Sequence, residues 1–194
     1  MMIQKMNRYL RFILLLFVFL MAVSPGFGQK DVVRLEKWAT AVSLPPMENF
    51  YRVDNGVFRS GQPSDEAFIV LERFGIHEIL SLRYWHDNEK KAEETDIVLH
   101  QVPMNAYYIR DKDVVAALKV IRNRKGKLLF HCQHGSDRTG LICAMYRIVF
   151  QNWSKTDAIN EMKNGGYGFH RIFFNIPRYI ENVDVSKIKQ AVEN

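Results

Sequence analysis

The feature that most constrains this chain is an apolar run that ends in a cysteine and is followed at once by a short loop and a helix-like pattern. It occupies KLLFHCQHGSDRTGLICAMYRIV, residues 127–149. Leu128, Leu129 and Phe130 make a short continuous apolar run, which is typical of a central strand covered on both faces. Such strands belong to sheets with helices packed on either side.

The rest of the chain alternates between strand-like and helix-like patterns. Two short extended pieces surround an Asn55-Gly56 turn. Further strands are expected over 76–82 and 97–102, and a loop over 103–112 leads to a helix that starts near Val114. The other expected helices cover residues 64–74, 88–95, 139–150, 155–163 and 172–181. This alternation predicts an α/β fold in a single domain, with a central, mostly parallel sheet flanked by helices.

The first 28 residues have the three-part pattern of a secretory signal peptide. Lys5, Arg8 and Arg11 precede an apolar run over 12–23, and small residues follow up to Gly28. The run is short for a membrane span, which needs about 20 apolar residues. We therefore expect cleavage after Gly28 and export to a periplasm or to the cell exterior, with no stable membrane span afterwards. An uncleaved membrane anchor is the alternative.

Composition and helix breakers divide the remainder of the chain. We expect a leader over 29–48, which contains Pro45-Pro46, a folded domain over 49–182 and a C-terminal tail over 183–194. The whole chain has 27 basic and 21 acidic side chains, a net charge of +6, but residues 1–28 hold three basic and no acidic ones. Residues 29–194 therefore carry +3, so nucleic acid is not an expected partner.

Cysteine and histidine usage indicates neither a disulfide nor a metal. Cys143 falls inside the helical pattern that follows Cys132, and these are the only two cysteines. A strand-end cysteine and one in the next helix meet only if the loop curls tightly, so a structural disulfide is not expected. The six histidines are scattered without ligand spacing. We expect no metal and no cofactor.

The loop has the composition of an anion site. Backbone N–H groups of a glycine-containing loop converge with a helix N-terminus, so an anion is favoured there. Cys132 lies at the mouth of this nest, where a thiol beside a cation is expected to be a thiolate at neutral pH. Arg138 can hold two phosphate oxygens at once with its planar guanidinium. These groups together suit attack on the phosphorus of a phosphate ester.

The pattern His131-Cys132-x5-Arg138-Thr139 resembles the signature loop of the cysteine-dependent protein tyrosine and dual-specificity phosphatases. The resemblance implies their fold, and that Cys132 becomes a phosphocysteine while Arg138 binds the phosphoryl group and stabilises the transition state. It also implies that Thr139 hydrogen-bonds the leaving thiolate and that His131 helps to poise Cys132. Gly135 would let the loop backbone turn inward.

A second stretch extends the resemblance. Residues 56–63, GVFRSGQP, are similar to the opening segment of the atypical dual-specificity phosphatases of plants and fungi, some of which cleave inositol pyrophosphates. The likeness covers about residues 49–182.

Three aspartates are candidates for the proton donor to the leaving oxygen. In the resembled family an aspartate on a separate loop has this role, and Asp111 and Asp113 follow the 103–108 stretch. Asp113 equally suits the first turn of the next helix, so Asp111 is preferred of the two. Asp137, directly before Arg138, resembles the loop aspartate to which the acid role has been assigned in myotubularin lipid phosphatases. Its alternative role is to orient Arg138 or nearby backbone.

The substrate is expected to be a phosphorylated protein or a small phosphoester. Residues expected to line the nest are Gln133, His134, Gly135, Ser136, Asp137 and Arg138, and none of them is a lysine. Aromatic residues that could wall the cleft are Tyr84, Trp85, Tyr107 and Tyr108. Basic residues that could reach its rim are Arg83, His86, Arg110, Lys112, Lys163, His170 and Arg171.

We therefore place phosphotyrosine or phosphoprotein substrates ahead of inositol phosphates and pyrophosphates. Two alternatives come from other classes: a catalytically inactive phosphate-binding module, and a redox-sensing thiol protein with Cys143 as the resolving partner of Cys132. The oligomeric state has no signal in the sequence.

Overall fold

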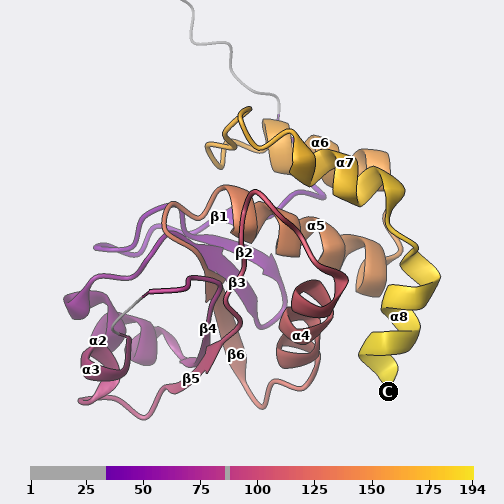
Figure 1. Cartoon of the computed structure of the whole chain (residues 1–194). Helices are drawn as coiled ribbons and strands as arrows, with labels where there is room; N and C mark the ends of the chain where they lie inside the picture. Colours follow the sequence, from indigo (N-terminus) through magenta and orange to yellow (C-terminus); the bar gives the residue numbers. More distant parts are fainter. Residues whose placement is uncertain (1–33, 86–87) are drawn as a thin grey trace, which may run out of the picture. The chain divides into compact units, whose positions relative to one another are not determined.

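A computed structural model describes residues 34–85 and 88–194 (Figure 1). The predicted signal peptide over 1–28 lies outside the described residues, and so does His86. Six strands are present in this part of the chain: β1 (Thr40–Ala41), β2 (Tyr51–Asp54), β3 (Val57–Ser60), β4 (Ile76–Ser81), β5 (Val98–Gln101) and β6 (Lys127–His131). The helices are α2 (Asp65–Phe74), α3 (Asn88–Ala92), α4 (Asp111–Arg122), α5 (Asp137–Gln151), α6 (Lys155–Asn164), α7 (Asn175–Asn182) and α8 (Val185–Glu193).

The strands form one mostly parallel sheet in the order β1-β2-β3-β6-β4-β5. Strands β3, β6, β4 and β5 pair in parallel, whereas β1 and β2 pair antiparallel at one edge. The Asn55-Gly56 turn joins β2 to β3, with Gly56 at φ +80°. This arrangement confirms the predicted α/β fold with a central, mostly parallel sheet.

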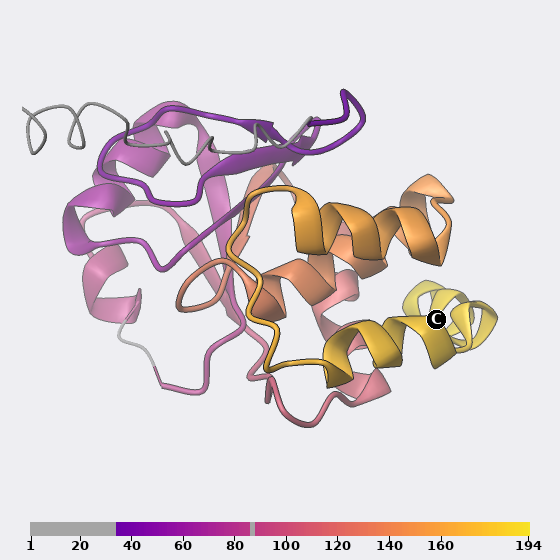
Figure 2. The same cartoon turned by 90° about the horizontal axis from the view of Figure 1, so that it is seen from above.

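Strand β6 lies between β3 and β4 and is buried on both faces, as its apolar run indicates. Leu128 and Phe130 belong to one hydrophobic core, and Leu129, pointing the opposite way, belongs to the other. Figures 1 and 2 show α2 and α3 on one side of the sheet and α4 to α8 on the other. Successive side chains of β6 therefore pack alternately against the two helical layers.

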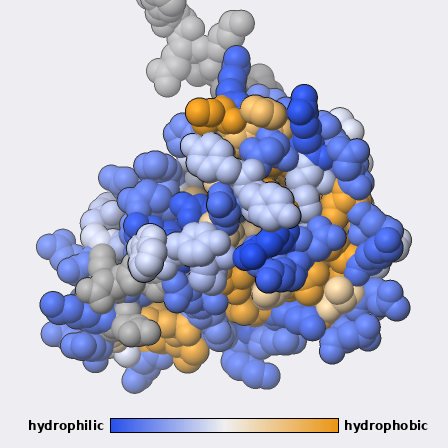
Figure 3. Space-filling view, in the orientation of Figure 1, coloured by the Kyte–Doolittle hydropathy of each residue, from blue (hydrophilic) through white to orange (hydrophobic). Residues whose placement is uncertain are grey.

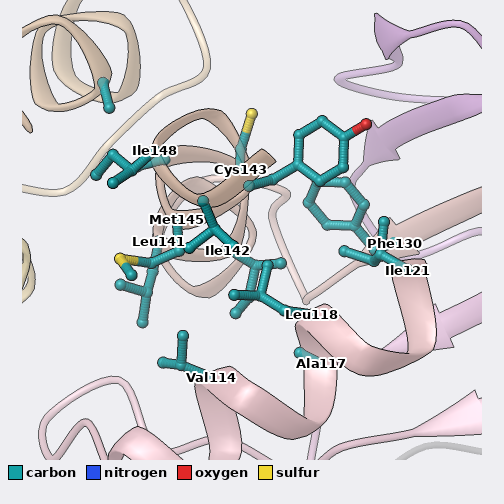
Figure 4. Close-up of a cluster of buried hydrophobic side chains, with 14 of the residues drawn as sticks. Val114, Ala117, Leu118, Ile121, Phe130, Leu141, Ile142, Cys143, Met145 and Ile148 are labelled. Atoms are coloured by element: carbon teal, nitrogen blue, oxygen red, sulfur yellow. The ribbon is translucent and has the colours of Figure 1, made fainter. Parts of the chain in front are cut away.

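The larger core joins α4 and α5 to the sheet. In Figure 4, Val114 and Leu118 of α4 lie toward Leu141 and Ile142 of α5, beside Phe130 of β6. All five side chains are fully buried. This packing fixes the start of α5, and therefore the loop that precedes it, against the sheet.

The folded unit extends beyond the expected 49–182 at both ends. Trp38 and Ala39, in the expected leader, are 5% and 1% exposed. Residues 183–194, expected as a tail, contain α8, whose Ile188 and Val192 pack into the larger core. Both segments carry apolar side chains that need a partner surface, and the α4–α5 layer provides one for α8.

Two helix starts also differ from the expected ones. Helix α4 begins at Asp111 rather than near Val114, and α7 begins at Asn175 rather than at residue 172. Ile172 and Phe174 are 64% and 60% exposed, so the apolar residues there are not the buried face of a helix. None of the helices within 34–85 and 88–194 has the length and apolar character that a membrane span needs.

Candidate active site

The cysteine loop lies at the carboxyl ends of the three central strands. Ser60 of β3 and Ser81 of β4 both stand in register with His131, the last residue of β6. Residues 132–136 form the loop, and α5 starts at Asp137. Crevices outside the carboxyl ends of parallel strands are the usual ligand sites of such sheets.

Three successive carbonyl groups of this loop are held by donors from other parts of the chain. The backbone N–H of Gln62 donates to the Gln133 oxygen at 3.0 Å, and Asn49 Nδ2 donates to the His134 oxygen at 2.8 Å. Arg59 Nη2 donates to the Gly135 oxygen at 2.5 Å. Because C=O and N–H point in opposite directions across a planar trans peptide, the next three N–H groups point away from these donors. They are thereby available to an anion.

Gly135 fits where no other residue would. Its φ is +73°, and a Cβ added there would lie 2.5 Å from the carbonyl carbon of Ser60. The loop thus passes directly over the end of β3, which allows Arg59 on that strand to reach the Gly135 carbonyl.

Arg59 is a buried cation beneath the loop. It is fully buried, and its guanidinium carbon lies 3.7 Å from the centre of the Tyr167 ring. The Tyr167 hydroxyl donates to Glu161 at 3.0 Å, and Glu161 pairs with Arg147 at 2.8 Å. This chain of buried contacts connects β3, α5 and α6 under the loop.

The loop forms one wall of a cavity of about 580 Å³. The other walls come from the segments after β4 and after β5 and from the segment before α7. The lining residues are Arg83, Tyr84, Trp85, Ala106, Gln133, His134, Asp137, Arg138, His170, Ile172 and Phe173. Cys132 is 2% exposed at the start of the loop. Of the six residues expected to line the nest, the structure brings Gln133, His134, Asp137 and Arg138 together on the cavity surface, whereas Gly135 and Ser136 are not among the lining residues.

Two arginines give this cavity a positive field. Arg138 is held by the carbonyl oxygen of Leu82 at 3.2 Å, and Arg83 donates to the Gln62 side chain at 2.8 Å. Burial and the positive charge of Arg138 lower the pKa of Arg83, while Cys132 acts in the opposite direction. The two guanidinium groups and Cys132 are thus close enough to interact.

His131 and Thr139 flank the loop from inside. His131 is fully buried; its Nε2 lies 3.2 Å from Asn88 Nδ2 and its Nδ1 lies 3.2 Å from the Cys132 carbonyl oxygen. The ring therefore supports the backbone of Cys132. Thr139 is also fully buried, and its hydroxyl has no hydrogen-bond partner among the described residues. The Thr139 hydroxyl is therefore available as a hydrogen-bond donor in the first turn of α5, next to the loop.

Of the three candidate aspartates, only Asp137 lines the cavity. Asp111 accepts a hydrogen bond from the Tyr179 hydroxyl at 2.8 Å and lines a separate cavity between α4 and α8. Asp113 pairs with Arg110 through both oxygens, at 2.8 and 3.0 Å, in the first turn of α4. Asp137 is 6% exposed, and both of its oxygens accept from His170 at 2.9 Å.

The candidate rim residues separate into two groups. Arg83 and His170 line the cavity, whereas Arg110 and Lys112 line a surface pocket beside α4, and Lys163 and Arg171 line another near α7.

Of the aromatic candidates, Tyr84 and Trp85 line the cavity and are 48% and 86% exposed. Tyr107 packs against Phe173, with ring centroids 4.9 Å apart. Figure 3, in the orientation of Figure 1, shows side chains of intermediate hydropathy, drawn pale, beside strongly hydrophilic ones.

Cys143 lies in the core and not in the cavity. Both cysteines are free and buried, and in Figure 4 the Cys143 side chain points from α5 away from α4. Burial raises the pKa of Cys143 to about 11, and Glu161 adds to the effect. Its thiol therefore stays protonated near neutral pH. Among the described residues, no three His, Cys, Asp or Glu side chains are grouped so that they could hold a metal ion.

Sequence reasoning did not identify the anchors of the loop. Asn49, Arg59, Gln62 and Tyr167 support it, yet none belongs to the contiguous motif. Arg59 and Gln62 fall within the 56–63 stretch of family resemblance, and Tyr167 falls within the glycine-rich stretch 165–169, which is a candidate border of the site.

Comparison with known proteins groups the chain with phosphatases. A model described as "Tyrosine phosphatase family" matches residues 44–194. The chain is 31% identical over 169 residues to the dual specificity protein phosphatase TpbA of Pseudomonas aeruginosa, which covers 86% of this chain and 76% of that protein. It is 33% identical over 144 residues to the inositol diphosphatase DSP2 of Oryza sativa subsp. japonica, which covers 69% and 70%.

The fold shows the same likeness. The crystal structure of P. aeruginosa TpbA in complex with pTyr matches with a TM-score of 0.75 at 31% identity, covering 83% of this chain and 99% of that one. The match confirms the predicted dual-specificity phosphatase-like fold.

Proposed function

Because the chain belongs to the tyrosine phosphatase family, we propose that it hydrolyses phosphate monoesters through a phosphocysteine intermediate, with phosphotyrosine in proteins as the main substrate. The observation that carries this proposal is the anchored loop. Three of its carbonyls are held by donors from other parts of the chain, so the following N–H groups, which lie between Cys132 and Arg138, point away from those donors. A phosphoryl group bound there meets the nucleophile and a bidentate cation together.

Each group has a role that follows from its position. The thiolate of Cys132 attacks phosphorus, and the ester oxygen leaves with the electron pair of its bond. Arg138 and the loop N–H groups stabilise the charge that builds on the phosphoryl oxygens in the transition state. Thr139 can donate to the sulfur when the thiolate is later displaced by water, because its buried hydroxyl has no other partner among the described residues.

The cavity walls favour an aromatic phosphoester. Tyr84, Trp85 and Ile172 present exposed apolar surface around the cations, and such surface packs against the flat ring of phosphotyrosine. The structurally similar TpbA has been crystallised in complex with pTyr, which supports an aromatic phosphoester as the substrate.

An inositol phosphate or pyrophosphate is the second candidate. This candidate is favoured by the proximity of Arg83 to Arg138. Two adjacent guanidinium groups repel each other, and a substrate with a second phosphate group would supply the negative charge that balances both. The relative DSP2 carries the name inositol diphosphatase.

Two functions from other classes have less support. A module that only binds phosphate would not need Cys132, and here the cysteine and Arg138 are both in place. A redox-sensing pair with Cys143 would need a reactive second thiol, but burial raises the pKa of Cys143 to about 11.

We also propose export, from the signal-like pattern in residues 1–28. N-terminal sequencing of protein recovered from the periplasm or medium should begin at Gln29. Recovery of the intact chain from the cytoplasm alone would contradict this.

The enzymatic proposal is tested by phosphate release from a phosphotyrosine peptide and from an inositol pyrophosphate. We expect faster release from the peptide and, in Cys132→Ser, a loss of at least about 10⁴-fold. Rapid quench of the wild-type protein should leave phosphate on the peptide that contains Cys132. Release that persists in Cys132→Ser would refute the mechanism, and preference for the pyrophosphate would select the second substrate class.

A further inference from the structure

The candidate aspartates leave the source of the leaving-group proton open, and the structure contains another group in the right place. We propose that His170, oriented by Asp137, donates the proton to the leaving oxygen and then takes one from the attacking water. This inference rests on the proposed phosphatase function and names a residue for its acid–base step.

Asp137 fixes the imidazole of His170. The backbone N–H of His170 donates to Asp137 Oδ1, and ring Nδ1 lies 2.9 Å from Oδ2. An ionised carboxylate only accepts hydrogen bonds, so Nδ1 carries a hydrogen in this contact. Asp137 is nearly buried, and both of its oxygens are used by one partner. It is therefore better placed to orient a proton donor than to be one.

The other ring nitrogen, Nε2, is left for the cavity. The His170 side chain is 48% exposed and lines the cavity with His134 and Arg138. Its ring meets the His134 ring edge to face, with centroids 5.5 Å apart. In the part of the chain that the structure describes, Nε2 has no hydrogen-bond partner. Orientation of one imidazole nitrogen by a carboxylate frees the other for proton transfer, as in other histidine-dependent enzymes.

The segment that carries His170 is tied to the phosphate-binding loop. Ser136 Oγ donates to the Tyr167 carbonyl oxygen at 2.7 Å, and Asn49 Nδ2 donates to the same oxygen at 3.0 Å. Asn49 also holds the His134 carbonyl. These contacts, together with Asp137 directly before Arg138, keep the imidazole in a fixed position relative to the loop.

Among the lining residues that the structure describes, no other group has these properties. Asp137 is the only carboxylate among the described lining residues, and residues 103–110 contain neither aspartate nor glutamate. Arginine stays protonated and cannot exchange a proton at neutral pH. His134 lines the same cavity, but no carboxylate orients its ring in the described part of the chain. His170 is the titratable group that is both exposed to the cavity and held.

Protons and electron pairs balance over the two steps. Cys132 Sγ forms a bond to phosphorus as the bond to the ester oxygen breaks; that oxygen keeps the electron pair and takes the proton from His170 Nε2. The imidazole is now neutral. It accepts a proton from water as the water oxygen bonds to phosphorus and the phosphorus–sulfur bond breaks, with its electron pair returning to sulfur. Phosphate leaves, and the thiolate and the imidazolium are restored.

The test is a series of aryl phosphates whose leaving groups differ in basicity. His170→Asn is the informative variant, because its amide nitrogen can replace Nδ1 on Asp137 while Nε2 is lost. We expect kcat/KM to fall by about 10²-fold or more on phenyl phosphate and by less than about 10-fold on 4-nitrophenyl phosphate, whose leaving group needs no proton. Asp137→Asn should show the same pattern more weakly. His134→Gln is the matched control, and it should change kcat/KM by the same factor on both substrates.

The pH profile gives a second readout. His170 shares its surroundings with charged or titratable groups from every neighbouring segment: Arg83, Tyr84, His134, Asp137 and Arg138. The decline of kcat/KM on phenyl phosphate at high pH should be present in His134→Gln and absent in His170→Asn.

The outcomes separate this role from the proposed function. Equal losses on both substrates in His170→Asn, no loss on either, or a leaving-group effect confined to His134→Gln would each overturn the role of His170 while leaving Cys132-dependent catalysis in place. A wild-type protein without Cys132-dependent release of 4-nitrophenol would instead overturn the phosphatase proposal.

Discussion

At the scale of single residues, Gly135 is a position at which a side chain would disturb the site. Its positive φ disfavours any side chain, and the added Cβ would meet the backbone of Ser60 at 2.5 Å. Gly135→Ala must therefore move the loop away from β3 and release the Arg59 contact. We expect kcat/KM to fall by at least about 10²-fold, as for a displacement of about 1 Å in a positioned site. Steady-state kinetics on 4-nitrophenyl phosphate measure this.

Gly56→Ala is the matched control. Gly56 has φ +80° in the β2–β3 turn, but its added Cβ would meet only the Arg124 side chain at 3.8 Å. It should cost about 1–2 kcal/mol of unfolding free energy for the left-handed conformation and leave kcat/KM unchanged. If both variants lost activity equally, backbone strain alone would explain Gly135, and the close approach to β3 would not matter.

At the scale of elements, what the sequence predicted was local. The strand before Cys132, the loop and α5 are contiguous, so periodicity and turn residues sufficed. The anchors Asn49, Arg59 and Tyr167 are far from the loop in the chain and meet it only through the way strands and helices pack in three dimensions. No local sequence pattern predicts that packing.

The position of the proton donor depends on the fold for the same reason. Asp111 follows a strand and a loop in the sequence, but it starts α4 and accepts a hydrogen bond from Tyr179 outside the cavity. The Asp137–His170 contact joins two segments 33 positions apart. Only the fold shows that one orients the other.

An element-scale prediction concerns Glu78, which joins β4 to its two neighbours. It accepts from the N–H groups of Lys125 and Gly126 before β6, and its Oε2 lies 2.8 Å from His100 Nε2 on β5. Burial alone would raise the pKa of Glu78, but the Lys125 N–H and His100 outweigh it and hold the pKa below its usual value of 4.5.

The pH dependence of stability follows from this lowered pKa. The ionised form of Glu78 stabilises the fold fully above the unfolded-state value, and the contribution is lost as pH falls through the lower, folded-state value. The difference in unfolding free energy between wild type and Glu78→Gln should thus be largest near neutral pH and shrink below about pH 4.5. Urea titrations across pH measure it, with the exposed Glu181→Gln as the control. A difference that grew in acid would show that the carboxylate is not held in its ionised form.

At the scale of the whole molecule, the cavity and the stabilising helix α8 lie in different parts of the fold. The cavity lies at the carboxyl ends of β3, β4 and β6, whereas α8 closes the far side of the α4–α5 layer. Arg122 on α4 donates to the Val192 carbonyl of α8 at 2.7 Å. None of the described residues of α8 lines the cavity. The last twelve residues should therefore affect folding without affecting catalysis.

Ile188→Ala tests this separation. Ile188 is 2% exposed in the larger core, so its truncation should lower the unfolding free energy by about 2–5 kcal/mol, whereas Ile188→Val should cost about 0.5–1.5 kcal/mol. Gln190→Ala, on the exposed face of the same helix, should cost less than about 0.5 kcal/mol. At a temperature where all three variants are folded, kcat/KM should equal the wild-type value. A loss of kcat/KM in folded Ile188→Ala would mean that α8 is coupled through α4 and α5 to the loop, and an unchanged stability would mean that residues 183–194 are a tail after all.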